Sequence, residues 1–116
     1  MIDRIRLTAA AKIQLATLKR KTGIEHYNSI CRHALCMSLA NATPPPKEEF
    51  NFNGGLEIDW RVFTGGNEAL YLNLLFVRYG KLSVEEVRDV ICAHLHRGLS
   101  YMLIKADICD GFSLPR

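Results

Sequence analysis

The side chains best suited to covalent or metal chemistry are cysteines and histidines, four of each. The cysteines form no C-x-x-C pair, and His94 and His96 fall in a segment expected to be helical, where residues two apart point to different faces. The spacing therefore predicts no metal site, no iron–sulfur cluster and no cofactor. We expect the cysteines to be small buried hydrophobic residues, and a catalytic thiol would require a histidine beside it in the fold. They are Cys31, Cys36, Cys92 and Cys109.

A pair of carboxylates offers a second kind of chemistry. Glu57 and Asp59 are two residues apart in an alternating, strand-like segment, so both side chains would share one face. Such a pair can hold Mg²⁺ for phosphodiester cleavage, which makes a weak metal-dependent nickase one hypothesis. A nuclease of that kind would carry a lysine two residues later, where Arg61 stands, so we interpret the pair mainly as a solvated or ion-paired strand face.

Sequence motifs of the common catalytic and nucleotide-binding sites are absent. The chain contains no G-x-x-x-x-G-K, no G-x-G-x-x-G, no H-E-x-x-H and no G-x-S-x-G. We therefore predict no catalytic residue and a protein that is not an enzyme.

Positive charge is concentrated in the first third of the chain. Residues 1–36 carry seven Lys and Arg against two acids, whereas residues 37–116 carry eight bases against ten acids. This asymmetry favours a polyanion as the partner of the N-terminal part. The run Lys19-Arg20-Lys21 either compensates the dipole at a helix end or contacts phosphates, and the density of bases around it favours phosphate contact.

The elements expected to position these bases are a strand and two helices within residues 1–40. Residues 4–7 alternate polar and apolar, which predicts a short strand that needs a partner strand. Thr8 and Gly23 would bound a helix over 9–22, and Asn28 or Ser29 would cap a second helix to about residue 39. This order is typical of ribbon-helix-helix repressors, in which two chains pair their strands and place them in the DNA major groove. A helical hairpin with a solvated basic face is the alternative.

The remaining elements follow a proline-rich connector over 41–49. Two alternating runs around Asn53-Gly54 predict a β-hairpin within 50–65. Two core helices should occupy 67–104, the second opened by a capping box at Ser83 and Glu86. The first of them is apolar on nearly all sides, which predicts deep burial of its hydrophobic residues. These are Leu70, Leu74, Leu75 and Val77.

Size and composition limit the fold class. The chain has 116 residues, 48% of them hydrophobic, which predicts one globular domain over 1–116 and excludes global disorder. No apolar run approaches the ~20 residues that a membrane span needs, and no secretory signal is recognisable, so we expect a cytoplasmic protein. We predict a mainly α fold: a small helical bundle with a short N-terminal ribbon-helix-helix-like unit and one β-hairpin.

Several blocks of sequence, taken in order, resemble one known family. The N-terminal block contains Arg6-Leu7-Thr8 and the run from Leu18 to Ile24. The more specific blocks are Glu57-Ile58-Asp59-Trp60-Arg61-Val62-Phe63-Thr64-Gly65 and His94-Leu95-His96-Arg97-Gly98. Together they are similar to the DNA sulfur modification protein DndE family of the bacterial DNA phosphorothioation system, over nearly the whole chain.

The resemblance implies a DNA-binding accessory subunit rather than the sulfur-transfer enzyme. Members of this family are described as largely helical tetramers with a basic surface that favours nicked double-stranded DNA, and they act with other sulfur-modification proteins. The His94–Gly98 block is then expected to be a packing or oligomer element, and a scaffold that only docks onto those proteins is a further alternative. Carried over to this sequence, the expected DNA contacts are first Lys19, Arg20 and Lys21, then Arg4, Arg6 and Arg32, and last Lys12.

Overall fold

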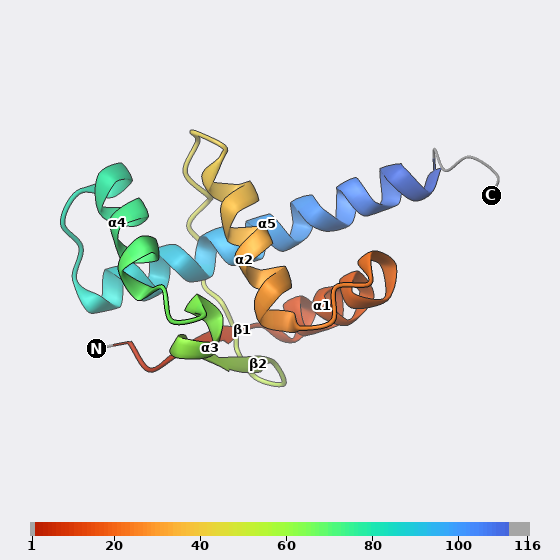
Figure 1. Cartoon of the computed structure of the whole chain (residues 1–116), viewed down its shortest axis with the longest axis horizontal. Coiled ribbons are helices and arrows are strands. Elements are labelled where there is room, and N and C mark those ends of the chain that lie inside the picture. The colour runs from red at the N-terminus through yellow and green to blue at the C-terminus, as the bar shows by residue number, and fades with distance from the viewer. Residues whose placement is uncertain (1, 112–116) are drawn as a thin grey trace.

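The computed structural model describes residues 2–111 and is mainly helical, with five helices and a two-stranded antiparallel sheet in that range. The longest helix runs through the whole molecule, and two others lie against it (Figure 1). None of the helices in this range is long and apolar enough to cross a membrane. The elements are β1 (Arg4–Leu7), α1 (Ala9–Thr22), α2 (Tyr27–Leu39), β2 (Leu56–Asp59), α3 (Trp60–Thr64), α4 (Glu68–Tyr79) and α5 (Val84–Gly111).

Helix ends follow the local signals of the sequence. Thr8 caps α1 by accepting a hydrogen bond from the amide of Ala11, and Gly23 ends α1 with a φ of 75°. The capping box that opens α5 is formed, because Ser83 and Glu86 exchange backbone and side-chain hydrogen bonds. Helix α2 differs slightly: it begins at Tyr27, ahead of the expected caps, and its N-cap residue makes no side-chain hydrogen bond.

The predicted hairpin within 50–65 is wrong. Strand β2 pairs antiparallel with β1, from Arg4 opposite Asp59 to Leu7 opposite Leu56, and residues 50–52 form no strand. Although β1 is far from β2 in sequence, β1 is the better partner because its Ile5 and Leu7 side chains must be covered. Both side chains are buried in this arrangement. In the described chain β1 pairs with a strand of its own chain, whereas a ribbon-helix-helix repressor pairs this strand with that of a second copy.

Two local features explain this arrangement. A Cβ atom at Gly55 would lie 1.8 Å from the carbonyl oxygen of Leu7, so only glycine lets the chain pass the end of β1 before β2 begins. Strand β2 ends at Asp59, whose carboxylate accepts hydrogen bonds from the amides of Arg61 and Val62 at 2.9 and 3.3 Å. This cap starts helix α3 at Trp60, a residue that the alternation of the sequence places in the strand.

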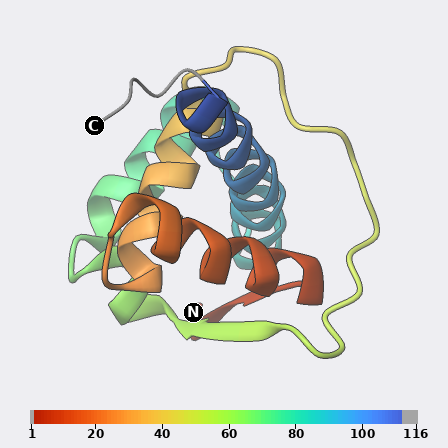
Figure 2. The same cartoon turned by 90° about the vertical axis from the view of Figure 1, so that its right-hand side faces the viewer.

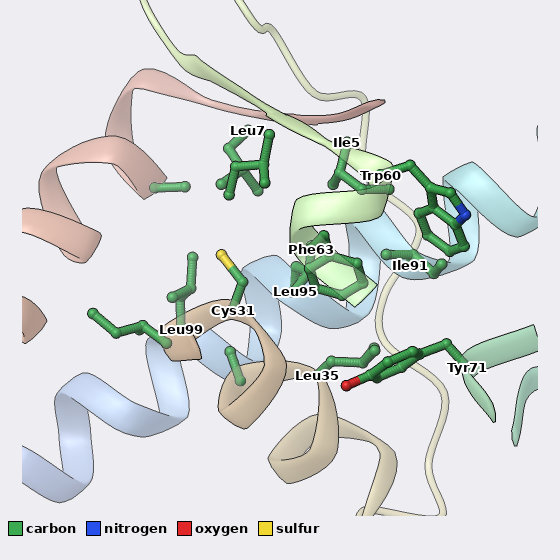
Figure 3. Packing of buried hydrophobic residues seen from close by; sticks show 14 of the residues in the cluster. Ile5, Leu7, Cys31, Leu35, Trp60, Phe63, Tyr71, Ile91, Leu95 and Leu99 are labelled. Atoms are coloured by element: carbon green, nitrogen blue, oxygen red, sulfur yellow. The ribbon is translucent and has the colours of Figure 1, made fainter. Parts of the chain in front are cut away.

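The core lies where α2 crosses α5, and the sheet, α1, α3 and α4 also contribute buried residues to it. Figure 3 shows Leu7 from β1, Phe63 from α3 and Leu95 from α5 directed into the same volume. The crossing is close because α5 carries Gly98, where a Cβ atom would lie 1.8 Å from the carbonyl oxygen of Ala34. The prediction that the His94–Gly98 block is a packing element is confirmed at this crossing.

Helix α4 is the largest departure from the expected burial. Leu75 and Tyr71 are buried, but Leu70, Leu74 and Val77 are 54, 42 and 89% exposed. The helix lies at one end of the molecule (Figure 1), where the rest of the described chain covers only one of its sides. The sequence predicts the apolar character of α4 correctly, but the described part of the chain does not cover the outer side of this helix.

The connector between α2 and β2 follows an extended path. Residues 40–55 contain no helix or strand and arc away from the helices before they return to the sheet (Figure 2). Three consecutive prolines, 44–46, keep the middle of this path extended. The connector therefore passes along the outside of the molecule and contains no helix or strand.

Candidate nucleic-acid interface

The cationic run Lys19-Arg20-Lys21 forms the last turn of α1. Lys19 and Arg20 are exposed, with the Lys19 ammonium 5.8 Å from the centre of the Tyr27 ring. Lys21 lies 3.0 Å from the carboxylate of Asp107, which ties the end of α1 to α5. Both functions expected of the run are thus compatible with its position: dipole compensation at a helix end, and exposed cations available to a phosphate backbone.

Arg4 and Arg6 occupy the exposed face of β1, as the alternation predicts. Their guanidinium nitrogens lie 3.2 and 3.4 Å from the two carboxylate oxygens of Glu57 on β2. All three side chains are about half exposed, and ion pairs of this kind contribute little to stability. The two arginines can therefore exchange their carboxylate partner for a phosphate at small cost.

Arg32 and Lys12 lie in different surroundings. The Arg32 guanidinium is half-buried and donates to the carbonyl oxygens of Val62 and Phe63 at 3.3 and 3.0 Å, so it closes the C-terminal end of α3. Lys12 is exposed on α1. The phosphate contacts assigned to these residues remain predictions, and Arg32 has a structural task that the sequence did not reveal.

The carboxylates considered for a nickase both have structural partners. Glu57 is bridged to Arg4 and Arg6, and Asp59 caps α3. Within residues 2–108, no group of three or more His, Cys, Asp or Glu side chains is arranged to hold a metal ion. Glu57 thus matches the ion-paired strand face that we expected, whereas Asp59 serves as a helix cap.

The buried cysteines are not activated nucleophiles. Cys31 and Cys92 are buried, and burial raises the pKa of each thiol to about 12. The Sγ atom of Cys92 lies 3.6 Å from Nδ1 of His96. That nitrogen, however, donates a hydrogen bond to the backbone oxygen of Cys92, 2.7 Å away. Cys36 is exposed, contrary to expectation, and the side chain of Cys109 lies outside the described residues.

A buried polar network, which no motif in the sequence signals, holds the start of the connector. His94 is completely buried and hydrogen-bonded to Ser38 at 2.7 Å and to Tyr79 at 2.6 Å. Burial, and then the nearby charges of Arg78 and Arg97, lower its pKa to about 4, so its ring is neutral near pH 7. His94 therefore hydrogen-bonds as a neutral ring inside the block that was expected to be a packing element.

The two arginines of this network reach the connector itself. Arg97 donates to the carbonyl oxygens of Ser38 and Thr43 at 2.8 and 2.7 Å. Arg78 donates to those of Leu39 and Asn41 at 2.6 and 2.7 Å. These contacts satisfy carbonyls at the end of α2 and fix the direction in which the connector leaves. Nothing in the spacing of Arg78 and Arg97 signals that they converge on one segment.

A groove of about 770 Å³ runs between the connector, β1 and the N-terminal half of α5. We call it the connector groove. Its walls include cations from all three segments and two aromatic rings from the connector, and Figure 2 shows the connector arching past α5 on this side. The residues concerned are Arg4, Arg6, Lys47, Phe50, Phe52 and Arg88. Only the first two are candidates from the sequence, because the others are brought together by the path of the connector.

Comparison with known proteins identifies the family of this chain. The family described as "DNA sulphur modification protein DndE" matches residues 4–109. The crystal structure of DndE from Escherichia coli B7A, involved in DNA phosphorothioation modification, has a similar fold, with a TM-score of 0.74 and 22% identity over 86% of this chain and 97% of that one. The structure of a DndE G21/24K mutant gives a TM-score of 0.71 and 20% identity, with 90 and 99% covered.

Among curated proteins, no significant match to this sequence is found. The family match covers nearly all of the described residues, including β1, β2 and the blocks on which the resemblance rests. The chain therefore belongs to the DndE family of DNA sulphur modification proteins.

Proposed function

We propose that this protein is the DNA-binding accessory subunit of DNA phosphorothioate modification, and that it contributes no catalytic chemistry of its own. The observation that carries the proposal is the group of exposed cations at the end of α1, in a chain of a DNA sulphur modification family. Double-stranded DNA, particularly at a nick, is the proposed ligand. Other proteins of the same modification system are the proposed partners that supply the sulfur chemistry.

Binding through phosphates makes a specific prediction about salt. Replacing Lys19, Arg20 and Lys21 together by alanine should weaken binding to duplex, nicked duplex and single strand whatever their sequence. Removing a phosphate-binding cation should also flatten the plot of log binding constant against log salt concentration, by about 1 per cation on duplex DNA. A salt titration of fluorescence anisotropy on the three labelled DNAs measures both effects.

The control removes the same charge elsewhere. Arg20→Ala and Lys81→Ala each delete one exposed cation, but Lys81 lies just before α5 begins, whereas the Lys21–Asp107 pair places Arg20 near the other end of that helix. Only Arg20→Ala should change the salt slope. Equal slopes for both variants would mean that net charge alone matters. Intact modification in cells after charge reversal of residues 19–21 would favour a scaffold that docks onto protein partners instead.

We also propose that the protein self-associates as a tetramer, and that the outer side of α4 forms one of its interfaces. Leu70, Leu74 and Val77 follow one another at i, i+4 and i+7, so they form a continuous apolar stripe on one face of the helix. All three are exposed, and Val77 is 89% exposed. A helix that is apolar on all sides is stable in water only when its outer side is covered, and a second copy offers the same stripe in return.

Charge placed on this stripe should dissociate the assembly without unfolding the chain. We expect Leu70→Glu/Val77→Glu to sediment as a smaller species than wild type, with unchanged circular dichroism. Ile13→Glu is the matched control, since Ile13 is an apolar residue 67% exposed on α1. A wild-type protein that sediments as a monomer at high concentration would refute this part of the proposal.

A further inference from the structure

The connector groove combines two chemistries, aromatic faces and several converging cations. Phe50 stacks on the His96 ring, with ring centres 4.3 Å apart and planes 25° from parallel. Phe52 follows at 6.2 Å from Phe50, with 29° between the ring planes. Both rings are only partly buried, so part of this aromatic surface remains accessible from the groove.

The charges that line the groove favour an anion. The Arg6 guanidinium lies over the Phe52 ring, 5.1 Å from its centre, so a cation rests on one face of the ring and would move aside for a stacked base. Arg4, Lys47 and Arg88 bring the cations to four, against the carboxylates of Glu48 and Asp89 in the lining and of Glu57, which pairs with Arg4 and Arg6. The excess positive charge and the exchangeable ion pairs of β1 suit a phosphate group.

The walls are held in place before any ligand arrives. His96 supports Phe50, and its own ring is fixed because Nε2 accepts from the Thr8 amide at 3.2 Å while Nδ1 donates to the oxygen of Cys92. Arg97 anchors Thr43 at the start of the connector, and the prolines restrict the segment that follows. A preorganised site of this kind loses little conformational entropy when it binds.

We propose that the connector groove binds an unpaired nucleotide of DNA, with the base stacked on the Phe50–Phe52 pair and the adjoining phosphates held by Arg4, Arg6 and Lys47. Stacking on protein rings requires a base whose own faces are free, which bases inside an intact duplex do not offer. A volume of about 770 Å³ lies in the range of sites for single small ligands. The inference rests on the proposed function, because it takes DNA as the ligand, and it adds the place where a strand end or frayed base at a nick would be recognised.

The test compares a short oligothymidylate with a strand of the same length and charge that lacks bases, and with intact duplex, all by anisotropy. Phe52→Leu keeps an apolar side chain but removes the ring. We expect it to weaken oligothymidylate binding about 5- to 150-fold, the range for loss of one stacked base, while abasic strand and duplex binding stay unchanged. Phe76→Leu is the matched control: Phe76 is 38% exposed on α4, outside the groove, and should change nothing.

A second variant tests the charge without touching the aromatic pair. Lys47 is exposed on the connector, so Lys47→Ala is expected to fold normally and to flatten the single-strand salt slope by about 0.7.

The inference is overturned if Phe52→Leu binds oligothymidylate as wild type does, or if it weakens binding of all three DNAs alike. Competition by an acidic peptide as effective as that by oligothymidylate would overturn it as well. If Phe52→Leu has no effect while wild type still binds duplex, the inference fails and the proposed function stands. If wild type binds none of the DNAs, both are refuted.

Discussion

Alanine at position 98 is expected to destabilise the protein by at least about 3 kcal/mol, or to prevent folding at 37 °C. The added Cβ atom would lie 1.8, 2.4 and 2.8 Å from the carbonyl oxygen, carbonyl carbon and Cα of Ala34. These are backbone atoms of α2, so no side chain can rotate out of the way. Relief requires that α2 and α5 move apart, and this crossing contains much of the buried core.

The sign of this effect distinguishes packing from helix propensity. In an ordinary helix interior, alanine is about 1 kcal/mol more favourable than glycine, so a Gly98→Ala variant that is as stable as wild type would contradict the close crossing. Urea unfolding followed by circular dichroism measures the change. Lys105→Ala, at an exposed position of the same helix, is the control and should stay within about 0.5 kcal/mol of wild type.

Acid is expected to destabilise the fold through His94. Burial and the charges of Arg78 and Arg97 lower the pKa of His94 to about 4 in the folded chain, against about 6.5 when unfolded. Between these values the unfolded chain binds the extra proton and the folded chain does not. The contribution of His94 to the free energy of unfolding is therefore complete above about pH 6.5. It decreases as the pH falls, by roughly 2–3 kcal/mol between pH 7 and pH 4.5.

His96 acts in the same direction. Burial lowers its pKa, and protonation would remove the Nε2 lone pair that accepts the Thr8 amide. The measurement is urea unfolding at pH 7.0, 5.5 and 4.5. His94→Gln should be less stable than wild type at pH 7 but should lose less stability between pH 7 and 4.5. His33→Gln, at an exposed position on α2, should keep the wild-type dependence. An unchanged pH profile in His94→Gln would assign the acid sensitivity to other groups.

Much of the local structure could be predicted because its causes are local. Thr8 and Gly23 bound α1, Ser83 and Glu86 open α5, and Arg4 and Arg6 alternate with Ile5 on β1 as the sequence pattern requires. Each signal acts over a few residues through hydrogen bonds or side-chain periodicity, so the sequence nearby is sufficient to read it. The positive charge of the N-terminal third is likewise evident from composition, and the family blocks indicate the class of protein.

Other features depend on segments that are far apart in the chain. The predicted partner of β2 is wrong because Asn53-Gly54 gives a strong local hairpin signal, whereas the burial of Ile5 and Leu7 decides the pairing. The exposure of Val77 could not be predicted either, because periodicity identifies an apolar face without saying what covers it.

The sequence by itself determined the helical fold class, the helix caps, the alternating face of β1 and the basic N-terminal third. Only the tertiary structure decided that Arg32 closes α3, that His94 is neutral inside a polar network, and that the connector brings Phe50 and Phe52 beside the arginines of β1. The physical reason is the range of the interactions involved. Caps and periodicity act within one or two turns, whereas a groove, a buried titrating group or a backbone crossing exists only after distant segments have packed together.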